Sequence, residues 1–523
     1  MNYAKVASDT NVPQNQQLTD NQVQNDAGGF VYKISKWEQL ERFLILGSEG
    51  GTYYVAEQKL TRDNAKNVMS CLNENLVKTY QITVDISDAG RAPKNDPAIF
   101  VLALSTLVPG GTDALRQNIN KVCRTGTHIL QLASYIKELR GWGRGVCRAI
   151  AHWYESKTPQ QLEFQLSKYQ SRYGWSHADV IRLSHPKLNA ASGMIAKWAL
   201  GKEEANINAA REYGLDTISN CELAKIATSY KEVLPLIQGG LLREHIPTQF
   251  LNEKAVWSEL LKNMPMMAMV RNLGKMSSLN LLTPMSSEEE MVVAKLSDTA
   301  AIKSSRIHPL QLLLAKSTYE KGFGIKGSLR WDPNDQIVGA LESAFYDSFD
   351  TVEPTGKRIM ISLDVSGSMR WNNINNTHLS CAEASAAMSL VTLKTEQKCM
   401  LNSFQDTLRP ISANKHDNLS TLMGKFPRTF GGTDCALPMM YAERDKIPVD
   451  CFVIYTDNDT WAGGTHPSVA LKNYSKSMGI DAKQIVVGMT ATQFSIADPA
   501  NSNSLDVVGF DTSVPSVMRE FMV

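Results

Sequence analysis

The chain has 523 residues, more than one hydrophobic core normally serves, so two or three domains are expected. Its hydrophobic content of 43% and charged content of 20% are those of an ordinary soluble protein. The formal net charge of +1 excludes a global electrostatic attraction to nucleic acid, so any such binding must come from a local basic surface.

The first part of the chain divides into a polar tail and a long helical region. Residues 1–24 are rich in Asn, Gln, Asp and Thr and lack apolar periodicity, so we expect a disordered tail. From Trp37 to Phe349, within a module expected over residues 25–352, apolar residues recur three and four positions apart between breaks at Gly, Pro or Asn. Such consecutive helices predict stacked antiparallel pairs, a solenoid-like array of the HEAT type.

Basic and aromatic residues alternate between Arg144 and Lys187. At about 100° per residue, Lys168 and Arg172 share one helix face, away from an apolar stripe formed by Leu162, Leu166, Tyr169 and Tyr173. Cations for phosphates and planar rings for bases are what single-stranded nucleic acid binding requires. A solvated helix face over core tryptophans would explain the same composition, and His185 would then be an ordinary loop histidine.

Near residues 352–354 the pattern changes to alternating strands and helices, which predicts a second domain over residues 356–523. An apolar run ends in the sequence Asp364-x-Ser366-x-Ser368, and another ends at Asp457, while the sequence FGGTD places Thr433 on a glycine-rich loop. These hard oxygen donors suit Mg²⁺ or another divalent cation, at the carboxyl edge where parallel sheets bind ligands. The expected metal ligands are Asp364, Ser366, Ser368, Thr433 and Asp457.

Signals for catalysis are weak. The metal loops contain no His or Glu in the pattern that a metal-activated water needs, and we expect His466 to be an ordinary loop residue. Gly47–Gly51 lacks the Lys-Ser/Thr of a P-loop and is expected to be a turn. The Asn-rich Trp371–Thr377 loop beside the metal residues has no assigned role.

Eight scattered cysteines form no CxxC pair, which argues for buried thiols in a reducing compartment rather than a zinc site or a disulfide framework. No apolar run approaches a membrane span, and the N-terminus is polar where a secretory signal would be apolar. A cytoplasmic protein without membrane contact is expected.

Three blocks, Asn25–Thr61, Lys168–Lys187 and Val256–Met276, resemble the TROVE module of the Ro ribonucleoprotein autoantigen family. The residues from Lys357 to Val523, with the metal ligands above, resemble a von Willebrand factor A domain with a metal-ion-dependent adhesion site. The resemblance implies an α plus α/β fold: a monomeric ring of HEAT-like repeats closed by an A domain with a doubly wound, mostly parallel sheet.

The same resemblance implies a non-enzymatic role in RNA quality control. The ring's basic hole would take single-stranded 3′ ends of misfolded RNAs, its outer surface would bind a small Y-type RNA, and the metal would bind an anion of a partner. An exoribonuclease such as polynucleotide phosphorylase is an expected partner. Lys168, Arg172 and His185 fall where the family's Y-RNA contacts lie; charge and neighbourhood add Arg144, Arg148 and Arg271.

Two alternatives from other classes remain. The first is a metal-dependent protein-adhesion module on a helical scaffold, with RNA incidental. The second is an Mg²⁺-dependent nuclease that uses Asp364 and Asp457. Binding of a protein partner that a chelator abolishes would favour the first, and chelator-sensitive RNA cleavage would favour the second.

Overall fold

Polar caps divide the helical region into short antiparallel helices. The computed structural model describes residues 11–47, 57–324, 328–349, 353–371, 379–426, 431–490, 492–509 and 511–523, without the side chains of residues 57–64. Ser35 and Thr158 each form a capping box at the start of a helix, and Gly47 ends the first helix at a positive φ. Residues 48–51 of the turn predicted at Gly47–Gly51 lie outside the described residues. The helices of the first half are α1 (Lys36–Leu46), α2 (Glu57–Glu74), α3 (Leu76–Ala89), α4 (Asp96–Ser105), α5 (Gly111–Val122), α6 (Gly126–Leu139), α7 (Arg144–Glu155), α8 (Pro159–Lys168), α9 (His177–Ser184) and α10 (Ala190–Ala199).

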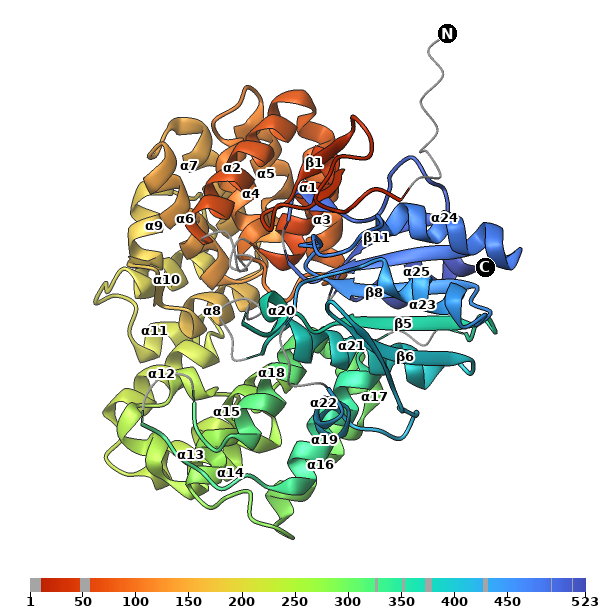
Figure 1. The fold of residues 1–523 in the computed structure, drawn as a ribbon. Coiled ribbons are helices and arrows are strands. Elements are labelled where there is room, and N and C mark those ends of the chain that lie inside the picture. Colours follow the sequence, from red (N-terminus) through yellow and green to blue (C-terminus); the bar gives the residue numbers. More distant parts are fainter. Residues whose placement is uncertain are drawn as a thin grey trace.

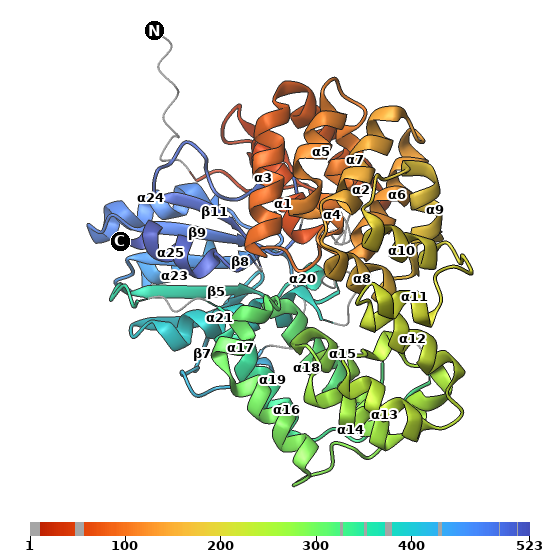
Figure 2. The same ribbon diagram turned by 180° about the vertical axis from the view of Figure 1, so that it is seen from behind.

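The second half of the array continues the same construction. It contains α11 (Ile207–Glu212), α12 (Asp216–Ile226), α13 (Tyr230–Gln238), the 3₁₀ turns η1 (Arg243–His245) and η2 (Thr248–Asn252), α14 (Lys254–Lys262), α15 (Met266–Ser278), α16 (Ser287–Ser297), α17 (Thr299–Ser305), α18 (Pro309–Glu320) and α19 (Asp335–Asp347). Together the helices form an arc whose two ends both reach the sheet-containing domain (Figure 1), as the reverse view also shows (Figure 2).

The C-terminal domain is a six-stranded sheet with helices on both faces. Its strand order is β11-β9-β8-β5-β6-β7, and all pairs are parallel except β6–β7. The strands are β5 (Ile359–Asp364), β6 (Cys399–Phe404), β7 (Leu408–Ile411), β8 (Cys451–Thr456), β9 (Lys483–Gly488) and β11 (Ser504–Val508); the helices are α20 (Gly367–Trp371), α21 (Cys381–Thr395), α22 (Leu419–Gly424), α23 (Leu437–Arg444), α24 (Pro467–Met478) and α25 (Val514–Met522). The predicted fold class, a helical array with a mostly parallel A domain, is confirmed.

The prediction of a disordered tail over residues 1–24 is wrong for residues 11–24. Gln14 is fully buried against the A domain, and β1 (Gln22–Gln24) pairs with β2 (Phe30–Lys33), which pairs with β10 (Phe494–Ser495). The polar amides that suggested disorder make hydrogen bonds to distant loops instead. Residues 1–10 lie outside the described part of the chain.

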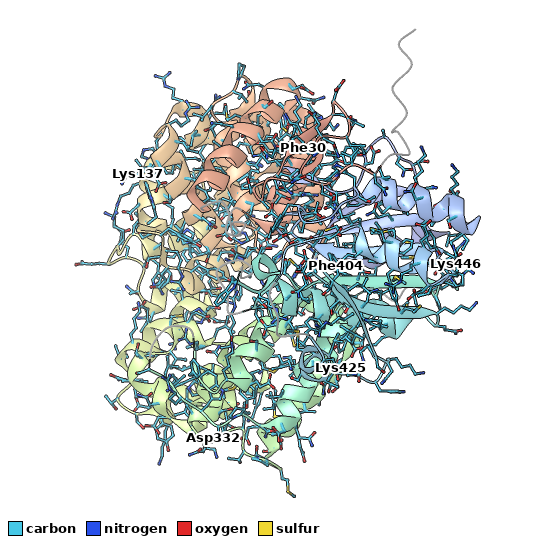
Figure 3. The ribbon with its side chains drawn as sticks, in the orientation of Figure 1. Phe30, Lys137, Asp332, Phe404, Lys425 and Lys446 are labelled. Atoms are coloured by element: carbon cyan, nitrogen blue, oxygen red, sulfur yellow. The ribbon has the colours of Figure 1, made fainter. Side chains whose placement is uncertain are left out.

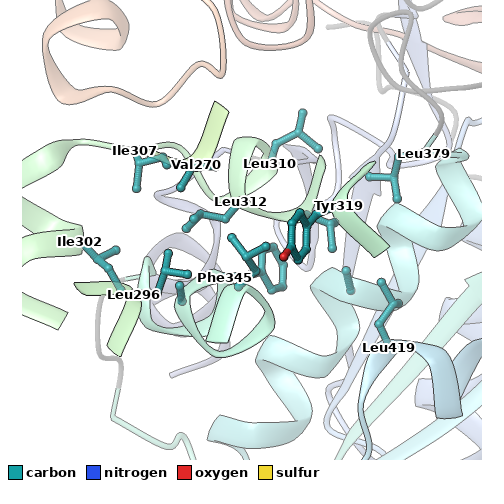
Figure 4. Packing of buried hydrophobic residues seen from close by; sticks show 14 of the residues in the cluster. Val270, Leu296, Ile302, Ile307, Leu310, Leu312, Tyr319, Phe345, Leu379 and Leu419 are labelled. Atoms are coloured by element: carbon teal, nitrogen blue, oxygen red, sulfur yellow. The ribbon is translucent and has the colours of Figure 1, made fainter. Parts of the chain in front are cut away.

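The two halves of the array meet the A domain in different ways. One hydrophobic cluster runs from the second half of the helical array, at Leu312 and Phe345, into the A domain, at Leu379 and Leu419 (Figure 4). The N-terminal helices have their own core, against which Val508 of the A domain packs, and ion pairs add to this contact. The Arg91 guanidinium, for example, pairs with Asp511 at 2.6 Å.

Polar contacts also join the two ends of the helical arc. The loop after α3 contacts the start of α18: the His308 ring lies 3.1 Å from the Arg91 carbonyl, and Gln311 donates to the Pro93 carbonyl at 2.6 Å. Charged side chains such as Lys137 and Lys446 project from the outside of the two bodies (Figure 3). The ring is therefore closed by hydrogen bonds on one side and by a continuous apolar core on the other.

Candidate metal centre and nucleic-acid interface

The β5–α20 loop brings three predicted metal ligands together. Asp364 ends β5, whose six residues are all buried, and its Oδ1 accepts a 2.9 Å hydrogen bond from the Ser366 amide. Ser368 lies in the first turn of α20, and its hydroxyl is 3.1 Å from that of Ser366. All three side chains are at most 5% exposed. A carboxylate and two hydroxyls therefore share one buried loop.

The parallel sheet places Asp457 beside Asp364. Leu363 of β5 pairs with Tyr455 of β8, so the two strands end together, and the Thr456 hydroxyl donates to Oδ2 of Asp364 at 2.8 Å. Burial raises the pKa of the Asp457 carboxyl, and a hydrogen bond from the Ser368 hydroxyl opposes this rise in part.

Thr433 joins this group from the glycine-rich loop. Its carbonyl accepts hydrogen bonds from the amides of Trp461 (2.9 Å) and Ala462 (3.0 Å), which tie the loop to the segment after β8. Two residues further on, the Cys435 sulfur lies 3.7 Å from the Thr456 hydroxyl. The structure therefore gathers all five predicted ligands around the ends of β5 and β8; Phe430, in the same motif, is not described.

The charges at this edge fit a divalent cation. Burial, followed by the charge of Asp457, raises the pKa of Asp364 to about 7, and burial also raises the pKa of Asp457. Oδ2 of Asp457 is buried and has no hydrogen-bond partner among the described residues. Two adjacent buried carboxyls without a counter-cation favour protonation or a bound metal ion.

Hydroxyls are essential to any such site. Across the described residues, no group of three or more His, Cys, Asp or Glu side chains could hold a metal ion. The donor set at the ends of β5 and β8 would instead be two carboxylates and three hydroxyls, together with water. Such all-oxygen sets with retained waters suit Mg²⁺.

Sequence reasoning missed a third carboxyl, Asp459. It is 1% exposed, and its amide donates to Oδ1 of Asp457 at 3.2 Å. Burial raises its pKa to about 9, with further contributions from the charges of Asp457, Asp26 and Asp364. The sequence signal that could have identified Asp459 is its position two residues after Asp457.

His466 lies in the loop before α24, as expected, but it is buried rather than exposed. This residue is the N-cap of α24 and is 1% exposed, since the N-terminal segment covers it. Its Nε2 lies 2.8 Å from the Gln16 carbonyl and its Nδ1 lies 3.4 Å from the Gln22 amide. Burial lowers its pKa, so the ring is a neutral structural group.

The common helix face predicted for Lys168 and Arg172 does not exist. α8 ends at Lys168, and Arg172 lies in β3 (Ser171–Arg172), which pairs with β4 (Trp175–Ser176). The two residues of the turn, Tyr173 and Gly174, have φ of 54° and 74°, the geometry of a tight hairpin. Local turn chemistry therefore ends the helical periodicity, and the apolar stripe stops at Leu166.

The candidate RNA residues nonetheless occupy accessible positions. Arg172 and His185 are exposed, and Lys168 is half-buried with its ammonium 5.1 Å from the Phe164 ring centroid and 5.3 Å from that of Tyr169. His185 caps α9 in the left-handed conformation, φ 48°. We call the segment from Phe164 to Lys187 the hairpin face.

The remaining candidates lie elsewhere. Arg144 and Arg148 are exposed one turn apart on α7, which packs against α9. Arg271 is exposed on α15, in the other half of the array, where it lines a cavity. The structure therefore groups five of the six candidates on neighbouring elements and separates Arg271.

Some of the interleaved aromatic residues belong to the core. Trp153 and Tyr154 are fully buried, and the Tyr154 hydroxyl lies 2.8 Å from Nδ1 of His177. Tyr173, by contrast, is 52% exposed at the tip of the hairpin. Trp153 and Tyr154 therefore belong to the core, while Tyr173 is accessible to a ligand.

Comparisons with known proteins agree with this architecture. Residues 23–214 and 237–318 match the TROVE domain, and residues 358–522 match the Ro60 vWA domain. The chain belongs to the Ro60 family. The "RNA-binding protein RO60" of Deinococcus radiodurans is 38% identical over 532 residues, with 99% of both chains covered. The protein of the same name from Caenorhabditis elegans is 36% identical over 589 residues, covering 97% of this chain and 91% of that protein.

A solved member of the Ro60 family has the same fold. The crystal structure of the Deinococcus radiodurans RO (RSR) protein superposes with a TM-score of 0.71 and 37% identity, covering 93% of this chain and 99% of that chain. The resemblance stated from the sequence is thereby confirmed. Among the described helices, none has the length and apolar character needed to cross a membrane.

Proposed function

We propose that this Ro60 family member is the RNA-binding subunit of a ribonucleoprotein. It would bind a small stem-forming Y-type RNA on its outer surface and the single-stranded 3′ ends of misfolded RNAs, in cytoplasmic RNA quality control. The support comes from relatives named as RNA-binding proteins and from the hairpin face. The observation that carries the proposal is the exposed Arg172 beside the exposed Tyr173.

The cations of this region are available to phosphates. Arg172 donates only to the carbonyl of its neighbour Ser171, at 2.7 Å, and neither Lys168 nor Arg148 forms an ion pair with a described carboxylate. Arg182, by contrast, forms an ion pair with Asp179 at 3.6 Å. Unpaired cations on a chain of net charge +1 provide the local basic surface that RNA binding requires.

For the A domain we propose a non-catalytic divalent cation, Mg²⁺ in the first instance. Asp364, Ser366, Ser368, Thr433 and Asp457 would hold it, and the bound ion would supply an electrophilic position for the carboxylate of a protein partner. An exoribonuclease is one candidate for this partner. A catalytic role is disfavoured because His466 is occupied by the N-terminal segment.

The test is the RNA that the full chain carries. The tagged chain would be purified from its own cells, and the bound RNA would be sequenced, with Lys168→Ala/Arg172→Ala beside the wild type. A matched control removes two exposed lysines of α24, Lys472→Ala/Lys476→Ala. We expect structured small RNAs with the wild type and the control, and their depletion with the hairpin-face variant. Equal recovery of the same RNAs from all three would contradict the proposal.

A metal-dependent protein-interaction module is the second candidate, favoured by the buried, unpaired Oδ2 of Asp457. The same purification can be repeated in a chelator. Protein partners that are lost while RNA is retained would assign the metal to protein binding alongside RNA binding. If the chain captures proteins in a chelator-sensitive way and carries no RNA, the protein-interaction function alone is supported.

A further inference from the structure

A cavity of about 730 Å³ lies in the second half of the helical array. Its lining includes no residue of the candidate metal centre or of the hairpin face, although η1 in its wall contacts α8. Its walls come from η1, η2, α14, α15, α18, the loop that precedes α4 and the loop between α18 and α19. Most of the interior is apolar. The side chains that form this apolar wall include Trp257, Val270, Leu310, Leu314, Tyr319 and Trp331.

Hydrogen bonds fix the aromatic part of this wall. The Trp331 indole N–H donates to the Tyr319 carbonyl at 2.9 Å, and the two rings stack with centroids 6.2 Å apart and planes 20° apart. Trp331 also packs on Gly274, where an added Cβ would lie 2.7 Å from the indole. The wall is therefore rigid, so little conformational entropy is lost when a ligand binds against it.

The rim of the cavity carries one sign of charge. Lys94, Arg243, Arg271 and Lys275 line it, and the described lining residues include no Asp or Glu. Asn252 holds Lys275 in place, since its Oδ1 accepts from the ammonium at 2.9 Å. Arg243 and Arg271 are exposed and form no ion pair with a described residue. An anionic group at the rim would meet the guanidinium groups of these two arginines.

One acceptor inside the cavity lacks a donor. The Gln311 amide nitrogen donates to the Pro93 carbonyl at 2.6 Å, whereas Oε1 of Gln311 is buried and has no partner among the described residues. A buried acceptor without a partner is unfavourable, so a ligand N–H would be favoured where rotation of the Gln311 side chain brings Oε1 to the cavity surface.

From these features we infer that the cavity binds one nucleotide unit, with the base against the apolar wall and the phosphate on the basic rim. The volume is typical of sites for small organic ligands. A base supplies the flat apolar surface and the N–H that Gln311 lacks, and a phosphate supplies the charge. The unit can belong to an RNA strand, in which case the inference rests on the proposed function, or it can be a free mononucleotide.

The experiment titrates the full chain with AMP, with adenosine, with ribose 5-phosphate and with a short oligoadenylate, by calorimetry. We expect AMP to bind and the other two small molecules to bind at least about tenfold more weakly, since adenosine lacks the phosphate that would contact the rim and ribose 5-phosphate lacks the base that would contact the apolar wall. Arg243→Gln/Arg271→Gln should weaken AMP at least about tenfold, whereas Lys472→Gln/Lys476→Gln should not. Ala315→Trp, which fills the cavity without removing charge, should also abolish AMP binding; its melting temperature checks the fold.

The outcomes separate the two sources and the two proposals. Oligoadenylate that displaces AMP identifies an RNA nucleotide as the ligand, and AMP binding without displacement identifies a free mononucleotide. The inference would be overturned if ribose 5-phosphate bound as tightly as AMP. It would also be overturned if the arginine variant bound AMP and oligoadenylate as tightly as the wild type does. If a structured RNA still depends on Lys168 and Arg172 in that case, the proposed function stands and only the cavity assignment fails.

Discussion

The side-chain amide of Gln14 donates a 2.6 Å hydrogen bond to Oδ1 of Asp434, the residue that follows Thr433. The same nitrogen donates to the Thr465 carbonyl at 2.8 Å. Further along the N-terminal segment, Asn25 donates to the carbonyls of Asn458 (3.2 Å) and Thr460 (2.8 Å). The N-terminal segment therefore holds both loops that complete the candidate metal centre.

Gln14→Ala should destabilise the protein and weaken its metal binding. The substitution leaves the 7%-exposed Asp434 carboxyl without its side-chain donor, an expected loss of about 1–3 kcal/mol. Urea unfolding and Mg²⁺ titration measure the two effects. Gln17→Ala is the control, because Gln17 is exposed. Equal metal affinity in both variants would show that the segment does not support the site.

Asp364→Ala should abolish Mg²⁺ binding and leave the secondary structure intact. The strands that flank Asp364 are fully buried and build their core without metal, unlike a zinc finger whose ligands supply the folding energy. Calorimetric Mg²⁺ titration and circular dichroism report on the two properties. Global unfolding of the variant would instead mean that the residue is required for the fold.

The stability of the metal-free protein should fall as the pH rises from about 4 to about 7. Burial and the charge of Asp457 raise the pKa of Asp364 from 3.8 to about 7. The folded state thus keeps a proton that the unfolded chain has released, so the contribution of Asp364 is largest below about pH 4 and is lost towards about pH 7. Asp364→Asn removes this titration.

Urea midpoints of the wild type and Asp364→Asn, measured in chelator between about pH 4 and about pH 8, test this sign. We expect the wild type to lose stability relative to the variant as the pH rises. A difference between the two proteins that is constant across this range, or that grows in the opposite direction, is the contradicting result.

Purified chain should leave single-stranded RNA uncut in Mg²⁺. The described loops around Asp364 and Asp457 place no free histidine at the site, since His466 is engaged by Gln16 and Gln22. A gel-based cleavage assay over several hours checks this. Cleavage that disappears in Asp364→Ala and in Asp457→Ala would establish the nuclease alternative.

That the five candidate metal ligands lie together could be predicted from the sequence, because each follows a strand or lies on a glycine loop, and parallel strands end at one edge. The hairpin at Tyr173 could not be predicted, since apolar spacing continues through Tyr169 and Tyr173 although the backbone turns there. The N-terminal segment was misread for a different reason. Composition cannot show that the Gln14 amide has a buried partner 420 residues away.

The salt dependence of RNA binding tests the central proposal most directly. A stem-forming RNA would be titrated at several salt concentrations with the wild type, with Lys168→Ala/Arg172→Ala, and with Lys472→Ala/Lys476→Ala. Each lost duplex phosphate contact lowers the slope of log K against log salt by about 0.9. We expect the hairpin-face variant to bind more weakly with a slope flattened by about one to two units, and the control to match the wild type. An unchanged affinity and slope in the hairpin-face variant would mean that this face is only solvated.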